Sequence, residues 1–196
     1  MTVGPALESY AQNQEDIIAW DYFGRKTDGF FVEVGVNHPT ELSQTWFLEQ
    51  RGRKGILIEP LPACCEKLRV VRKNSIVCEA AAGAPEQVGE ATLNVAQSDI
   101  GSHLDEASTE LPLAARIKFA VRTRDSILGE RHAPHVDLLS VDTEGMELKV
   151  LRGFDLQQHC PALGMRTQKK RDANTVLPSS GGGVFILPSY ANIRQD

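Results

Sequence analysis

The sequence predicts a single α/β domain with a mostly parallel sheet that is covered by helices on both faces. In residues 30–81, three short apolar runs that fit buried strands alternate with two segments of helical character. Strand–helix–strand order of this kind favours a parallel sheet with right-handed crossovers. The length of 196 residues is enough for one sizeable core.

The first half of the chain supplies six predicted elements in close succession. They are a helix at 10–23, a strand at 30–36, a helix at 39–50, a strand at 56–58, a helix at 61–73 and a strand at 75–81. The apolar residues expected to face the core from the three helices are Ile17, Trp20 and Phe23; Leu42, Trp46 and Phe47; and Leu61, Leu68 and Val71. Pro39 suits the first turn of its helix, because the N–H that proline lacks is not needed there.

The second half is less regular. Its predicted elements are alternating strands at 91–96 and 117–123, a helical turn at 125–128, a buried strand at 136–141 and a helix after Gly145. That last helix is expected to bury Leu148, Val150 and Leu151 and to end at Gly153 as a C-cap. The short polar segment 98–104 has the composition of a functional loop.

The carboxyl-terminal residues depart from this pattern. Further strand–helix units are expected after Leu163, but the chain becomes polar and then rich in proline, serine and glycine, as in a linker. We therefore predict a domain at residues 1–163 and an atypical, poorly packed tail at 164–196, so that this end of the sheet is incomplete.

Composition narrows the class of protein. The net charge of −5, from 26 acidic and 21 basic residues, argues against a nucleic-acid partner. No apolar run is long enough to cross a membrane, and no signal peptide is recognised. The four cysteines form no C-x-x-C pair, which favours reduced thiols and a cytoplasmic location. His132 and His135 lack further ligands at suitable spacing, so no metal site is predicted.

Two acids stand at the ends of successive predicted strands. Glu33 and Glu59 are placed where parallel sheets bind their ligands, and an acid at the second position suits ribose hydroxyls. The turn after Gly35 lacks the further glycines of G-x-G-x-x-G, and Pro39 removes a donor, so a pyrophosphate is disfavoured. S-adenosylmethionine has no phosphate, and its positive groups suit Glu33. Alternatively, Glu33 is a buried acid that caps the next helix or pairs with a base.

Four segments together resemble the FkbM-type methyltransferase family: 10–16, 30–39, 55–60 and, most strongly, 137–154. The resemblance covers about residues 8–163. It implies a Rossmann-like, class I fold that uses S-adenosylmethionine. It also implies O-methylation of a hydroxyl on a small molecule, typically a sugar or a secondary metabolite, by a chain whose oligomeric state stays open.

The resemblance also implies roles for individual residues. Cofactor contacts are expected from Glu33, Gly35 and Asn37 at the methionine end, from Glu59 at the ribose, from residues 79–81, including Ala81, beside adenine, and from Asp142 near the transferred methyl. A base must take the hydroxyl proton, and Asp142 is the first candidate, followed by Glu144 and His38. Glu144 could instead cap the following helix, and His38 could be an ordinary surface histidine.

Two other functions remain open at this point. The atypical tail leaves room for a catalytically silent, truncated methyltransferase-like binding domain. A nicotinamide-dependent oxidoreductase shares the sheet and its acids, although the missing glycines argue against it.

Overall fold

The computed structural model describes residues 7–96, 113–133, 135–143, 145–155, 159, 161–166 and 183–186. Its helices are α1 (Glu15–Tyr22), α2 (Trp46–Glu49), α3 (Pro62–Val71), α4 (Arg124–Glu130) and α5 (Glu147–Arg152), with a short 3₁₀ helix at Pro85–Gln87. Its strands are β1 (Phe30–Val34), β2 (Lys54–Glu59), β3 (Ser75–Glu79), β4 (Ala81–Ala82), β5 (Gly89–Ala96), β6 (Leu113–Arg122), β7 (Leu138–Val141), β8 (Leu163–Arg166) and β9 (Gly183–Ile186).

A six-stranded sheet in the order β3-β2-β1-β7-β8-β9 forms the middle layer. The pairs from β3 through β8 are all parallel, and β9 alone runs antiparallel to β8. The chain builds outwards from β1 in one direction to β3 and then continues on the other side of β1 with β7. Open parallel sheets bind ligands where the strand order reverses in this way, so we expect a site at the carboxyl ends of β1 and β7, the region called the crevice below.

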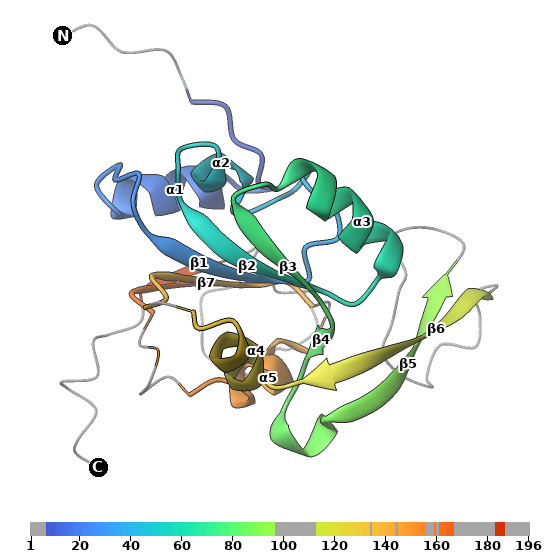
Figure 1. The fold of residues 1–196 in the computed structure, drawn as a ribbon. Coiled ribbons are helices and arrows are strands. Elements are labelled where there is room, and N and C mark those ends of the chain that lie inside the picture. The colour runs from blue at the N-terminus through green and yellow to red at the C-terminus, as the bar shows by residue number, and fades with distance from the viewer. Residues whose placement is uncertain are drawn as a thin grey trace, which may run out of the picture.

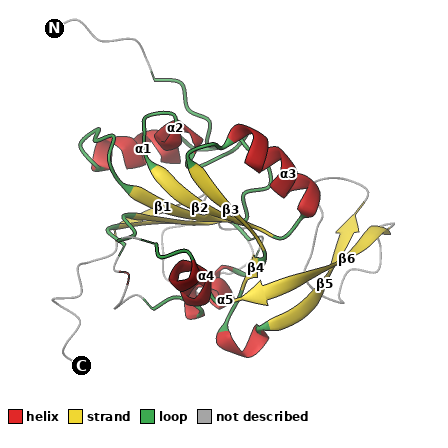
Figure 2. Cartoon of the chain, in the orientation of Figure 1, coloured by secondary structure: helices red, strands yellow, loops and turns green. Residues whose placement is uncertain are grey.

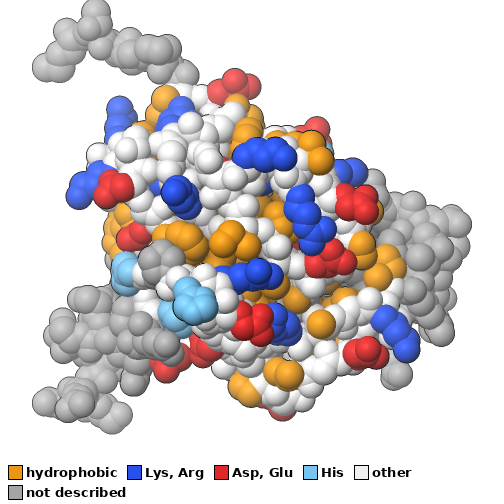
Figure 3. All heavy atoms as spheres, viewed as in Figure 1, with side chains coloured by type: hydrophobic (Ala, Val, Ile, Leu, Met, Phe, Trp, Pro, Cys, Tyr) orange, Lys and Arg blue, Asp and Glu red, His pale blue; other side chains and the backbone are white. Residues whose placement is uncertain are grey.

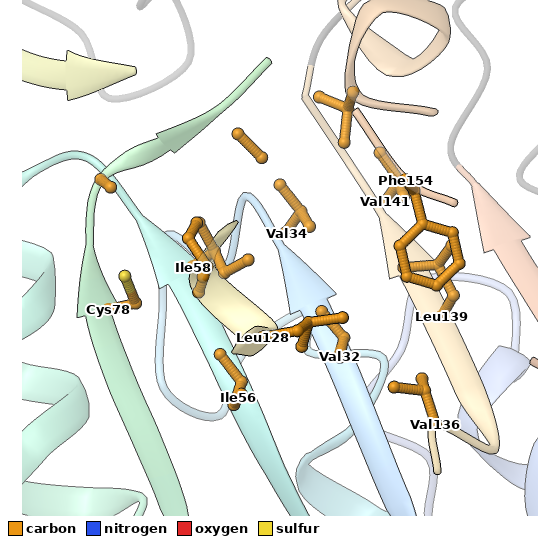
Figure 4. Packing of buried hydrophobic residues seen from close by; sticks show 14 residues of the cluster. Val32, Val34, Ile56, Ile58, Cys78, Leu128, Val136, Leu139, Val141 and Phe154 are labelled. Carbon is orange, nitrogen blue, oxygen red and sulfur yellow. The ribbon is translucent and has the colours of Figure 1, made fainter. Parts of the chain in front are cut away.

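Helices cover both faces of this sheet, as the sequence predicts. Helices α1, α2 and α3 lie on one face, and α4 and α5 lie on the other (Figure 1; Figure 2). Figure 4 shows the core on the α4–α5 face, where Leu128 lies next to Val32 and Phe154 lies next to Leu139 and Val141. Because the central strands are buried on both faces, they read as nearly continuous apolar runs.

A second, three-stranded sheet has the order β4-β6-β5 and projects to one side of the main body (Figure 1). Strands β5 and β6 are antiparallel, with a register shift between Val95 and Ala96. This confirms the two alternating strands that the sequence predicts. The predicted functional loop at 98–104 lies outside the described residues.

The helix predicted from Pro39 to Gln50 is wrong for most of its length, because only α2 is helical there. Leu42 has a φ of 56°, outside the helical region, and its side chain is 69% exposed rather than facing the core. The amide of Gln44, which a helix would use internally, instead donates to the Glu33 carboxylate at 3.2 Å. Tertiary contacts therefore replace the local hydrogen bonds on which the prediction rests.

Two smaller expectations about the helices also need correction. Leu148 is largely exposed on α5 and Val71 is exposed at the end of α3, whereas Val150 and Leu68 are buried as predicted. Gly153 is the C-cap of α5 as predicted, with a φ of −83° and thus outside the left-handed region. A glycine is needed there because a Cβ would lie 2.1 Å from the carbonyl oxygen of Gly83.

The carboxyl-terminal half of the sheet is more complete than the sequence suggests. Strand β8 extends the parallel sheet beyond β7, with Leu163 and Met165 buried, and β9 adds an antiparallel partner. The division at residue 163 stays a prediction, but backbone on its far side does pair with the sheet. Within the described part of the chain, no helix is long and apolar enough to span a membrane.

Candidate functional site

The loop that leaves β1 passes between the ends of β2 and β7. The amide of Gly35 donates to Ile58 O at 2.9 Å, and the amide of Asp142 donates to Val34 O at 2.9 Å. Gly35 has a φ of +80°, and a Cβ on it would lie 1.8 Å from the carbonyl oxygen of Asp142. Only glycine fits this crossing, so two predicted site residues, Gly35 and Asp142, are brought together here.

Glu59 joins the same loop to the start of α3. One of its carboxylate oxygens accepts the amide of Asn37 at 3.0 Å, and the other accepts the amide of Leu61 at 2.9 Å. Burial raises the pKa of Glu59, although these amides act in the opposite direction. The amide of Val36 donates to this carboxylate as well. Because two carboxylate oxygens can together accept about four hydrogen bonds, about one position remains for a ligand hydroxyl.

Asn37 forms the exposed rim of the crevice. It has a φ of 50°, in the left-handed region that asparagine tolerates better than most residues. Its side-chain oxygen lies 3.7 Å from the thiol of Cys64 on α3. The predicted contacts of Asn37 and Glu59 with a cofactor are therefore on one side of the crevice, near Gly35.

Glu33 faces away from this rim. It lies two residues after Phe31 on β1, so both side chains are on the same face and point towards the layer of α2 and α3. Besides the Gln44 amide, its carboxylate accepts the hydroxyl of Thr45, and it lies 3.7 Å from Arg72. Burial raises the pKa of Glu33, and the neighbouring Arg72 opposes this rise. The geometry fits the alternative of a buried acid paired with a base, and direct cofactor contact stays a prediction.

His38 closes the turn that follows Asn37. Its Nδ1 accepts the amides of Glu41 at 2.9 Å and Thr40 at 3.4 Å. A neutral imidazole that accepts at Nδ1 carries its proton on Nε2. In this arrangement His38 offers a hydrogen-bond donor to a ligand rather than a basic nitrogen.

The segment predicted to lie beside adenine is at the end of β3. The amide of Ala80 donates to Glu59 O at 3.2 Å, which places residues 79–81 next to the Glu59 backbone. Ala81 itself is buried in β4, and Glu79 pairs with Arg69 on the surface. Glu144 lies outside the described residues.

Arg72 is not among the residues that the sequence predicts for the site, yet its guanidinium is fully buried behind the crevice between Glu33 and Glu49. A signal is present in the helical spacing. Cys65 and Leu68 are the buried residues of α3, and Arg72 follows them on the same helical face. Val71, which is predicted to face the core because its side chain is apolar, points away from that face.

A separate cavity of about 490 Å³ lies at the amino ends of the strands, opposite the crevice. It is lined by residues 22–24, 26, 28 and 29 and by Arg53 and Asp137, which precede β1, β2 and β7. The carboxyl ends of the strands, with Glu59 and Asp142, are remote from it. We therefore assign the candidate site to the crevice and not to this cavity.

Comparison with known proteins gives one family. A family model described as "Methyltransferase FkbM domain" matches residues 33–185, which is most of the chain and includes β8 and most of β9. No curated protein matches the sequence significantly.

Proposed function

The chain belongs to the FkbM methyltransferase family, and on that premise we propose that it transfers a methyl group from S-adenosylmethionine to a hydroxyl oxygen of a small molecule. The observation that carries the choice of methyl donor is the use of the backbone amides in residues 35–41. A phosphate-bearing cofactor would need several of these amides free at the end of β1.

The turn has no such free amides. Gly35 donates to Ile58, Val36 and Asn37 to Glu59, His38 to Val36, and Thr40 and Glu41 to His38, while Pro39 has no N–H. The loop therefore has no free amide to donate to a phosphate, whereas the Glu59 carboxylate still suits a ribose hydroxyl. This donor set fits a cofactor with a ribose and no phosphate, and it disfavours a nicotinamide dinucleotide.

When bound, S-adenosylmethionine supplies an electrophilic methyl group on a positively charged sulfur. The chain would have to hold the acceptor hydroxyl in line and remove its proton as the oxygen attacks. We assign proton removal to Asp142, because it ends β7 beside Gly35 at the mouth of the crevice. Glu144 is the second candidate, and His38 is better placed to donate a hydrogen bond from Nε2.

We propose a small acceptor such as a sugar or a secondary metabolite, as the family resemblance implies. The net charge is negative, and basic and acidic side chains are interspersed on the face shown in Figure 3, which does not favour a nucleic acid. A cytoplasmic location agrees with the free thiols of Cys64, Cys65 and Cys78.

Isothermal titration with S-adenosylhomocysteine tests the cofactor assignment, with Glu59→Ala as the site variant and Glu90→Ala, at an exposed position on β5, as a surface control. We expect binding to wild type and to Glu90→Ala, and a large loss in Glu59→Ala. Folded wild-type protein that does not bind would refute the proposal. Binding without methyl transfer to any hydroxyl acceptor would favour a silent binding domain instead.

A further inference from the structure

The side chain of Arg72 is 0% exposed, and it touches both ends of the segment that follows the crevice loop. Its guanidinium donates to Pro39 O at 3.2 Å, Ser43 Oγ at 3.2 Å, Thr45 Oγ1 at 2.7 Å and Glu49 Oε2 at 2.6 Å, and it lies 3.7 Å from Glu33 Oε2. A buried guanidinium with this many partners is a specific geometric device, because its planar fork fixes several acceptors at once.

The contacts fall on a segment that has little structure of its own. Residues 35–45 contain neither helix nor strand, so they lack the repeated backbone hydrogen bonds that would define their shape. Glu59 holds the outgoing part at Asn37, and Arg72 holds the returning part at Pro39, Ser43 and Thr45. His38 lies between these two anchors, and Asn37 is held directly at the first of them.

We propose that Arg72 is a positioning residue for the methyl-donor site, and that it holds residues 39–45 so that Asn37 and His38 line the crevice. The guanidinium is behind the loop and does not touch the crevice rim, so it acts through the backbone. This inference rests on the proposed function, because it treats the crevice as the S-adenosylmethionine site.

Glu49 anchors the guanidinium from the other side. It also accepts the amide of Asn74 at 3.0 Å and the hydroxyl of Ser75 at 2.6 Å, which ties it to the start of β3. Arg72 therefore connects the crevice loop to the rigid end of the sheet. Lysine would retain the positive charge at this position, but a single ammonium cannot span Glu49 and the loop in the same way.

The test compares Arg72→Lys with Arg69→Lys, a matched change on the exposed side of the same helix. S-adenosylhomocysteine affinity is measured by titration at a temperature where circular dichroism shows each variant to be folded. Hydrogen exchange of residues 36–45 is followed in parallel, without ligand. We expect Arg72→Lys to bind about tenfold more weakly, the size of about one lost hydrogen bond from the displaced loop, and to exchange faster in 36–45, with Arg69→Lys like wild type.

Wild-type affinity in folded Arg72→Lys would overturn the inference and leave Arg72 with a purely structural role. If Arg72→Lys does not fold, Thr45→Val removes one contact on the loop side, and the same weakening of binding is required of it. Failure of the proposed function is distinguishable, because wild type itself would then not bind. In that case the cofactor part of the inference falls, and unchanged exchange in 36–45 would also remove the loop-holding role.

Discussion

Replacing Gly35 by alanine tests the crossing of the β1 loop over the end of β7. The added Cβ would lie 1.8 Å from the carbonyl oxygen of Asp142, and Gly35 has a φ of +80°. The left-handed conformation costs a residue with a Cβ about 1–2 kcal/mol. Relief of the clash is an overpacking problem that costs about 1–3 kcal/mol more. We therefore expect Gly35→Ala to lower the free energy of unfolding by about 2–5 kcal/mol in total.

Gly24→Ala is the matched control. Gly24 has a φ of +62°, but a Cβ there would have no atom within 4 Å, so this variant carries the conformational cost without the clash. Both variants gain the same small benefit from a less flexible unfolded chain, which cancels in the comparison. Urea denaturation of the two variants and wild type should therefore separate them by about 1–3 kcal/mol.

Equal destabilisation by Gly35→Ala and Gly24→Ala would refute the steric argument, because it would leave only the cost of positive φ. The same pair bears on function. Gly35→Ala must push the β1 loop away from Asp142 and should weaken S-adenosylhomocysteine binding even where it is folded, whereas Gly24→Ala should bind like wild type.

Three further predictions concern other groups. Burial raises the pKa of Glu59 in the folded state, so the folded state holds the Glu59 proton more tightly than the unfolded state does. The contribution of Glu59 to the free energy of unfolding therefore falls as pH rises through its folded-state pKa. Ligand binding needs the carboxylate, so S-adenosylhomocysteine affinity in titrations should weaken as pH falls, and Glu59→Gln should abolish this dependence. Iodoacetamide should label half-buried Cys64 before buried Cys65, because burial raises the pKa of the Cys65 thiol to about 12. Bound S-adenosylhomocysteine should slow the labelling of Cys64, as followed by mass spectrometry. Equal labelling rates with and without ligand would contradict the proposed site. Arg124 is buried with no hydrogen-bond partner for Nε or Nη1 among the described residues, so Arg124→Met should leave the free energy of unfolding unchanged or raise it by about 1–4 kcal/mol, and a clear loss in urea denaturation would count against this.

The central strands are predictable because burial on both faces requires nearly continuous runs of apolar residues. β1, β2 and β7 consist mainly of apolar residues, and each lies within two residues of its predicted bounds. Strand β8 is harder to predict, since only Leu163 and Met165 mark its buried face and four residues carry little periodicity. Its partner β7 supplies the information that the local sequence lacks.

The candidate site is predictable in position but not in detail. An acid and a glycine after a buried strand place Glu59, Gly35 and Asp142 at one edge of the sheet. The direction of Glu33 is not visible in the same way, because it depends on which face of β1 meets α2 and α3 and which meets α4 and α5. Arg72, at the end of α3, packs against the same face of β1 as Glu33. From the sequence alone, the neighbouring apolar Val71 is the more obvious residue to bury.

The error in the predicted helix and the choice of cofactor have one physical origin. A helix starting at Pro39 would leave its first amides free at the crevice, which is the arrangement that binds phosphate. Instead, Glu33 takes the Gln44 amide, His38 takes those of Thr40 and Glu41, and no helix begins until Trp46. The same side-chain contacts that replace the helix therefore also occupy the amides that a phosphate would need. The proposed S-adenosylmethionine site therefore depends on carboxylates and not on backbone amides, with Glu59 assigned to the ribose hydroxyls and Asp142 to the region of the transferred methyl.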